Sequence, residues 1–107
     1  MSGLAVLVVG SGGREHALVR SLAKSVSVDS VHASPGNAGT AILGTNHKVS
    51  VNDINGIVLL AKNLDIDLVV VGPEGPLVNG LSDRLSDEGI ACFGPNSIGA
   101  KLEGSKL

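Results

Sequence analysis

The stretch that decides the fold is AVLVVGSGGREHAL, residues 5–18. An apolar run over residues 4–9 leads into the turn Gly10-Ser11-Gly12-Gly13, and a helical pattern follows from Glu15. A buried strand that is followed at once by a glycine-rich turn and a helix brings unpaired backbone N–H groups to the end of the strand. Because a helix N-terminus attracts anions, phosphate above all, we expect a ligand-binding edge at this turn.

Apolar runs and helical patterns alternate along the rest of the chain. We expect strands at residues 4–9, 30–33, 48–51, 67–71 and 90–93, and helices at 15–24, 53–64, 77–88 and 97–107. Asp53 is expected to cap the second helix and Gly89 to end the third. The alternation predicts an α/β fold, a Rossmann-like doubly wound parallel sheet of about five strands in the order 3-2-1-4-5.

Composition narrows the class of protein. The chain has 107 residues, 43% of them hydrophobic, and a net charge of −2, which fits a single globular domain over residues 1–107. The one aromatic residue, Phe93, and the lack of excess basic charge disfavour nucleic-acid partners. No apolar run is long enough to predict a membrane span, and the lone Cys92 is expected to be buried and unreactive. We expect a cytoplasmic protein.

Two further glycine-rich turns should lie beside the first. In open α/β sheets, ligands bind at the carboxyl ends of the strands where the winding reverses, here between strands one and four. The turns at 10–14, 35–40 and 72–76 would therefore converge on one crevice. The predicted binding residues are Gly12, Gly13, Arg14, Glu15, Pro35, Gly36, Asn37, Ala38, Gly39, Gly72, Pro73 and Glu74.

Several of the polar residues have two interpretations. Arg14 can bind a phosphate as a fork of donors or form a surface ion pair. Glu74 can accept hydrogen bonds from sugar hydroxyls or an amine, or be a solvated loop acid, and no second catalytic group accompanies it. His16 is a ligand contact or a packed helix histidine. His32 and His47 carry no sign of a partner, and no spacing of residues predicts a metal site.

Glu15 breaks the dinucleotide-binding pattern. That pattern requires glycine at the positions of Gly10 and Gly12, and a third glycine or alanine where Glu15 stands. A glutamate prevents the close packing of helix on strand and brings negative charge to the pyrophosphate position. The pattern's acidic residue after the second strand is also missing, because Asp29 precedes the predicted strand. Binding of NAD or FAD is therefore disfavoured, while a single phosphate or a polar sugar is allowed.

Four motifs together resemble one enzyme family. They are GSGGREHAL (10–18), PGNAGT (35–40), VVGPEGPLVNG (70–80), and FGP (93–95) with LEGSK (102–106). In this order and spacing they resemble the amino-terminal domain of the glycinamide ribonucleotide synthetases, or phosphoribosylamine–glycine ligases, within the ATP-grasp ligases. One departure is Gly75, where alanine is usual in the family.

The resemblance implies a fold and an activity. The family's amino-terminal, pre-ATP-grasp domain is Rossmann-like and binds no dinucleotide. The full enzyme joins glycine to 5-phosphoribosylamine in purine biosynthesis, through a glycyl phosphate made from ATP. By this resemblance, backbone donors and Arg14 would hold the phosphate and Glu74 the ribose.

The same resemblance implies that ATP and Mg²⁺ (or Mn²⁺) belong to the ATP-grasp and carboxy-terminal domains. The chain lacks those domains, so we expect a fragment that binds no cofactor and is inactive alone. Three alternatives stay open: a free-standing binding or regulatory module, the nucleotide domain of a dehydrogenase, and another ATP-grasp ligase of purine or carboxylase type.

Overall fold

The computed structural model describes residues 3–72 and 76–94, so the predicted helix at 97–107 lies outside the described residues. Strands and helices alternate along the chain. They are β1 (Leu4–Gly10), α1 (Gly13–Ala23), β2 (Val28–Pro35), α2 (Ala38–Leu43), β3 (Thr45–Asn46), α3 (Ile54–Asn63), β4 (Leu68–Val71), α4 (Pro76–Asp87) and β5 (Ala91–Phe93). In the described part of the chain, no helix has the length and apolarity that crossing a membrane requires.

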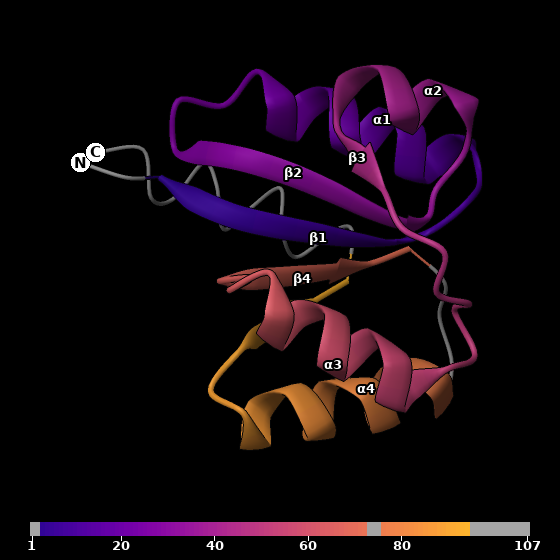
Figure 1. The fold of residues 1–107 in the computed structure, drawn as a ribbon, viewed down its shortest axis with the longest axis vertical. Coiled ribbons are helices and arrows are strands. Elements are labelled where there is room, and N and C mark those ends of the chain that lie inside the picture. Colours follow the sequence, from indigo (N-terminus) through magenta and orange to yellow (C-terminus); the bar gives the residue numbers. More distant parts are fainter. Residues whose placement is uncertain (1–2, 73–75, 95–107) are drawn as a thin grey trace.

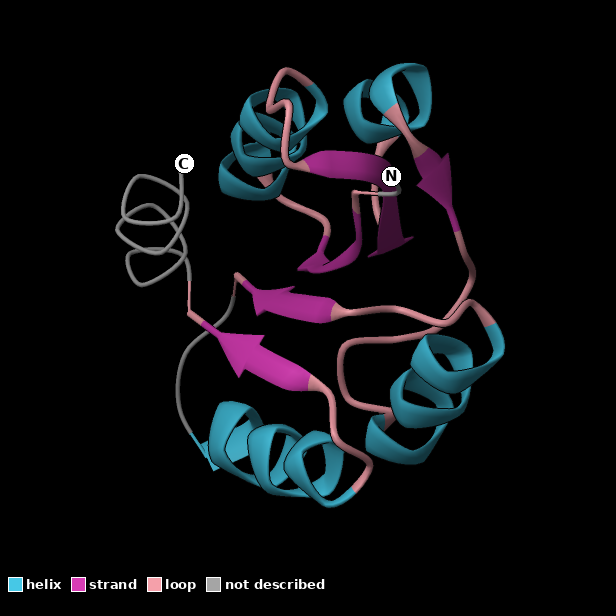
Figure 2. Ribbon diagram, turned by 90° about the vertical axis from the view of Figure 1, so that its left-hand side faces the viewer, coloured by secondary structure: helices cyan, strands magenta, loops and turns pink. Residues whose placement is uncertain are grey.

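The strands form one parallel sheet in the order β3-β2-β1-β4-β5, which confirms the predicted order (Figure 2). β1 is central because it pairs with β2 along one side and with β4 along the other. Winding therefore reverses between β1 and β4. The carboxyl ends of these two strands mark the place where such sheets bind ligands.

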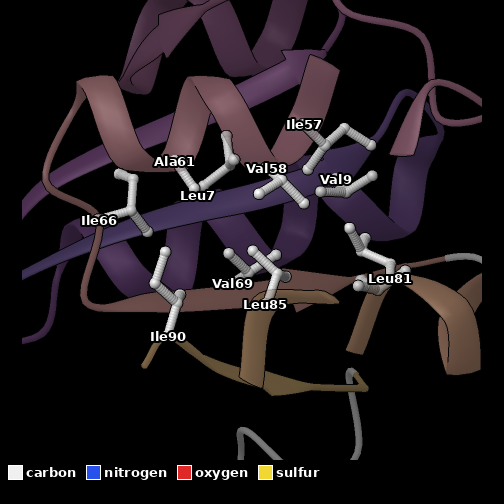
Figure 3. Close-up of a cluster of buried hydrophobic side chains, with 11 residues drawn as sticks. Leu7, Val9, Ile57, Val58, Ala61, Ile66, Val69, Leu81, Leu85 and Ile90 are labelled. Carbon is white, nitrogen blue, oxygen red and sulfur yellow. The ribbon is translucent and has the colours of Figure 1, made fainter. Parts of the chain in front are cut away.

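Helices cover both faces of the sheet, α1 and α2 on one side and α3 and α4 on the other (Figure 1). The side chains of β1 alternate accordingly. Val6 and Val8 belong to the cluster under α1, whereas Leu7 and Val9 belong to the cluster with α3 and α4. Figure 3 shows this second cluster, to which Ile57, Val58 and Ala61 of α3 and Leu81 and Leu85 of α4 contribute.

The expected ends of two helices are confirmed. The Asp53 carboxylate accepts the N–H of Gly56 at 2.9 Å and caps α3. Gly89, with φ of 76°, ends α4, and the N–H of Ile90 donates to the carbonyl of Leu85 at 2.9 Å. The residue types at these two positions therefore predicted where α3 begins and where α4 ends.

The third predicted strand, at residues 48–51, is wrong, because β3 is Thr45–Asn46. The fully buried Ser34 explains the difference. Its hydroxyl donates to the carbonyl of Val49 at 2.7 Å and accepts the N–H of Val49 at 3.0 Å. A side chain thus ties this segment to β2 in place of strand pairing. Val49 and Val51 are apolar because they pack as loop residues against the core cluster of α3 and α4.

The turn predicted at residues 35–40 is partly wrong, because Ala38–Leu43 form the helix α2. Asn37 caps this helix. Its side-chain oxygen accepts the N–H of Thr40 at 3.0 Å, and its own N–H donates to the Thr40 hydroxyl at 2.7 Å. A helix of six residues has too few turns to show a period in the sequence. β2 is also longer than predicted, so that Asp29 lies within the strand.

Candidate functional site

The three predicted loops meet at the carboxyl edge of the sheet. Pro35, the last residue of β2, pairs in register with Gly10 at the end of β1. The N–H of Gly36 donates to the carbonyl of Gly10 at 3.0 Å, and the N–H of Gly72 donates to the carbonyl of Val9, also at 3.0 Å. The predicted convergence is therefore confirmed for the described parts of the loops.

The third loop is described only at its start. Gly72 is buried directly after β4. Pro73 and Glu74, two of the predicted binding residues, lie outside the described residues. Their part in the site stays a prediction.

Asn37, in the second loop, stabilises the first loop at Ser11 and Gly12 through hydrogen bonds. Its side-chain amide donates to the carbonyl of Ser11 at 2.9 Å and to that of Gly12 at 3.1 Å. Asn37 is itself held in place by its neighbours. The Asn46 amide donates to the Asn37 carbonyl at 2.8 Å, and Thr40, which exchanges hydrogen bonds with Asn37, is fully buried. The sequence pointed to the Asn37 amide as a ligand contact. In the structure both its amide hydrogens bind the protein itself.

At the first turn of α1, the glycines are exposed to solvent and the side chain of Glu15 is buried. α1 begins at Gly13, earlier than the predicted residue 15, and Gly12 and Gly13 are exposed. Glu15 is only 7% exposed, and its Oε1 accepts the N–H of Gly12 at 2.8 Å. Glu15 thus caps the helix from its buried side, while Gly12 and Gly13 are exposed to solvent.

Arg14 reaches across the edge of the sheet. Its Nη1 donates to the carbonyl of Gly72 at 3.2 Å, so the side chain links the start of α1 to the end of β4. The residue is exposed. Arg14 therefore lies at the three-loop edge, where it joins the first loop to the third.

Gly36 and Gly39 both lie where neighbouring side chains leave no space for a Cβ atom. Gly36 has φ of 73°, and a Cβ there would meet the Asn46 side chain. A Cβ on Gly39 would meet the His16 ring at 2.6 Å. His16 therefore packs α1 against α2, as expected of a packed helix histidine. Ala38, between these glycines, is exposed at the first turn of α2.

One contact was missed from the sequence. Nδ1 of His32 and Nε2 of His47 lie 3.0 Å apart on the sheet edge formed by β2 and β3. Burial, and secondarily the neighbouring His47, lower the pKa of His32. No spacing signal could reveal this pair, because it depends on the register that places Thr45 beside His32.

A family model described as phosphoribosylglycinamide synthetase, N domain, matches residues 4–103. The chain belongs to this family. Over 101 residues, 94% of the chain, it is 48% identical to the phosphoribosylamine–glycine ligase of Mycobacterium tuberculosis and 50% identical to that of Agrobacterium fabrum. The ligase of Rhodopirellula baltica is 48% identical over the whole chain. In each case the match covers 24% of the relative, so the chain spans about a quarter of the length of these ligases.

In this N domain, other reactive side chains lie apart from the three loops. Among the described residues, no group of three or more His, Cys, Asp or Glu side chains is placed to hold a metal ion. Cys92 in β5 is half-buried, and burial raises the pKa of its thiol, which disfavours the reactive thiolate.

A shallow depression of about 400 Å³ lies before the starts of β4 and β5, at the opposite end of the sheet. Its lining includes Lys62 and Glu88, whose charged groups pair at 3.2 Å. This depression is therefore separate from the edge where the winding reverses.

Proposed function

We propose that this chain is the N domain of an ATP-dependent ligase that joins glycine to 5-phosphoribosylamine in purine biosynthesis. The observation that carries the proposal is the 48–50% identity to phosphoribosylamine–glycine ligases over nearly the whole chain. The convergence of three glycine-rich loops supports a share in substrate binding, because that edge is where an open α/β sheet takes its ligand.

The N domain contributes the sugar-phosphate part of the active site in this proposal. The exposed glycines Gly12 and Gly13 let the phosphate approach the first turn of α1, the Arg14 guanidinium faces the phosphate, and Glu74 accepts hydrogen bonds from the ribose. Asn37 and Glu15 fix the loops from within. The proposed lining comprises Gly12, Gly13, Arg14, Glu15, Pro35, Gly36, Asn37, Ala38, Gly39, Gly72, Pro73 and Glu74.

The rest of the ligase supplies the energy for the reaction. ATP and Mg²⁺ (or Mn²⁺) bind there in this proposal, as the family resemblance implies. Those further domains are this domain's partners in the cytoplasm, and the chain alone is inactive. The alternative, a free-standing binding or regulatory module, predicts a reading frame that stops after residue 107 with no ATP-grasp continuation.

Glu74→Gln in the full ligase tests the proposed role. Loss of a charged acceptor that binds the ribose should raise the KM for phosphoribosylamine about tenfold, while the KM for ATP stays unchanged. Glu88→Gln, at the opposite end of the sheet, is the matched control and should change neither constant. An equal loss for both substrates would contradict the assignment of Glu74 to the sugar.

A further inference from the structure

Two histidine rings face one another where β2 meets β3. His32 lies in β2 and His47 follows directly after β3, so the rings come from two segments that the sheet holds side by side. The N–H of His47 donates to the carbonyl of Ala33 at 2.8 Å, which continues the pairing of the two strands. Nδ1 of His32 and Nε2 of His47 lie 3.0 Å apart, and the ring centroids lie 5.1 Å apart. The backbone therefore brings two metal-binding nitrogen atoms together.

The chemistry of this pair selects one class of ion. Within residues 3–72 and 76–94, no third His, Cys, Asp or Glu side chain joins the two rings in a group that could hold a metal. Mg²⁺ and Ca²⁺ prefer oxygen ligands, whereas imidazole nitrogens suit the late first-row transition metals. Both histidines are only partly buried, so water can fill the other coordination positions of an ion that the two rings hold.

The distance between the two nitrogens narrows the choice further. Metal–nitrogen bonds to histidine are about 2.0–2.1 Å long, so an ion bound to two nitrogens 3.0 Å apart has an N–metal–N angle of about 91–97°. Tetragonal coordination by Cu²⁺ or Ni²⁺ places neighbouring ligands at nearly this angle. Tetrahedral coordination by Zn²⁺ would need the nitrogens about 3.3–3.4 Å apart.

The hydrogen bond between the rings does not oppose binding of an ion. An ion needs a lone pair on both facing nitrogens, whereas the hydrogen bond needs a proton on one of them. A neutral imidazole can carry its proton on either ring nitrogen, so the proton between the rings can move through water to the outer nitrogen of the same ring. The pair keeps its charge in this exchange. Each ring also turns toward the ion, which the broad torsional preference of a histidine ring allows.

We propose that His32 and His47 form a binding site for one late first-row transition-metal ion, Ni²⁺ or Cu²⁺, coordinated by Nδ1 of His32 and Nε2 of His47. Such an ion joins β2 to the segment after β3. The inference rests on the contact between the two rings, and it depends neither on the proposed function nor on the Mg²⁺ that the ligase would use.

Single substitutions remove one ligand at a time. His32→Gln and His47→Gln each replace a ring by a neutral side chain, and thermal unfolding first shows which variants fold. His16→Gln is the matched control, because it removes a histidine of α1 that packs against α2 and leaves the pair unchanged. The chains carry no affinity tag. Ni²⁺ is the probe because, unlike Cu²⁺, it does not oxidise the free thiol of Cys92.

Calorimetric titration with Ni²⁺ measures the affinity of each chain. We expect the parent to bind one Ni²⁺ and to bind no Mg²⁺. Loss of either ring should weaken Ni²⁺ binding at least ~10-fold, whereas His16→Gln should stay within about threefold of the parent.

NMR of the parent chain locates the ion without any substitution. Bound Ni²⁺ is paramagnetic and broadens the resonances of nearby nuclei. The amides of His32, Ala33 and His47 should broaden first, while those of Gly12 and Glu88 should stay sharp.

The proposal is overturned if the parent shows no saturable binding up to about 1 mM Ni²⁺, which would leave the two rings as a hydrogen-bonded pair only. It is equally overturned if folded His32→Gln and His47→Gln bind Ni²⁺ as tightly as the parent, or if the broadening centres on another part of the chain. Should one of these variants fail to fold, the other variant and the broadening in the parent decide.

Discussion

At the scale of single residues, two glycines at the three-loop edge leave space for the buried side chain of Glu15. Gly10 combines φ of 140° with close contact to the Glu15 side chain, and Gly72 meets the same carboxylate from the other strand. Gly13 is different, since a Cβ there would meet nothing within 4 Å. Neighbouring glycines of one motif thus serve different purposes, which substitution can separate.

Gly10→Ala should lower the free energy of unfolding by about 2–3 kcal/mol, because its Cβ both strains the backbone and collides with the buried Glu15 side chain. Gly13→Ala is the control, and should leave the free energy of unfolding unchanged or raise it by about 0.5 kcal/mol. Urea denaturation of both variants measures the difference. Equal losses in the two variants would contradict both the backbone strain at Gly10 and its collision with the Glu15 side chain.

The His32–His47 pair predicts a pH dependence of stability. Burial and His47 lower the pKa of His32 in the folded chain below its ordinary value of 6.5. The unfolded chain therefore binds the proton more readily, and the free energy of unfolding should fall as pH drops below about 6.5. Urea denaturation between pH 8 and about 5.5 follows the loss. His32→Gln should flatten this slope, and an unchanged slope would assign the effect to other groups.

At the scale of elements, two kinds of segment differ in how far the sequence predicts them. β1 and β4 are runs of buried Val and Leu, so their place in the centre of the sheet could be predicted from hydropathy alone. α2 and β3 are short. Asn37 accepts the N–H of Thr40 in α2, Asn46 of β3 donates to the carbonyl of Asn37, and Ser34 holds the following segment at Val49. Such contacts join residues across loops and leave no period in the sequence, which is why β3 was misplaced and α2 was missed.

Substitutions at Asn37 separate its two tasks. Asn37→Ser retains a side-chain oxygen that can cap α2, but loses the amide that donates to Ser11 and Gly12. We expect it to lower the free energy of unfolding by about 1 kcal/mol, and Asn37→Ala, which loses both, by about 2 kcal/mol.

Amide hydrogen exchange checks where each variant loosens. The first loop should exchange faster in both variants, and α2 should do so mainly in Asn37→Ala. Faster exchange confined to α2 in both variants would mean that Asn37 does not hold the first loop.

At the scale of the whole molecule, the position of the candidate site could be predicted from the rule that open α/β sheets bind ligands where the winding reverses. The order 3-2-1-4-5, with winding reversed between β1 and β4, places the three glycine-rich loops on one edge before any side chain is considered. The rule could not predict that Asn37 joins two of the loops or that Glu15 lies between the strands, because both depend on side-chain packing. Pro73 and Glu74 stay predictions, since they lie outside the described residues.

The central claim is that this N domain holds a sugar phosphate at the three-loop edge. The most direct test is an NMR titration of the isotope-labelled chain with ribose 5-phosphate, in which the backbone amide resonances are monitored. We predict saturable shifts at Gly12, Gly13, Gly36, Ala38 and Gly72, with no change at Lys62, Glu88 and Gly89 in the depression at the opposite end of the sheet. Shifts confined to that depression, or no saturable shift at any of the loop amides, would contradict the account.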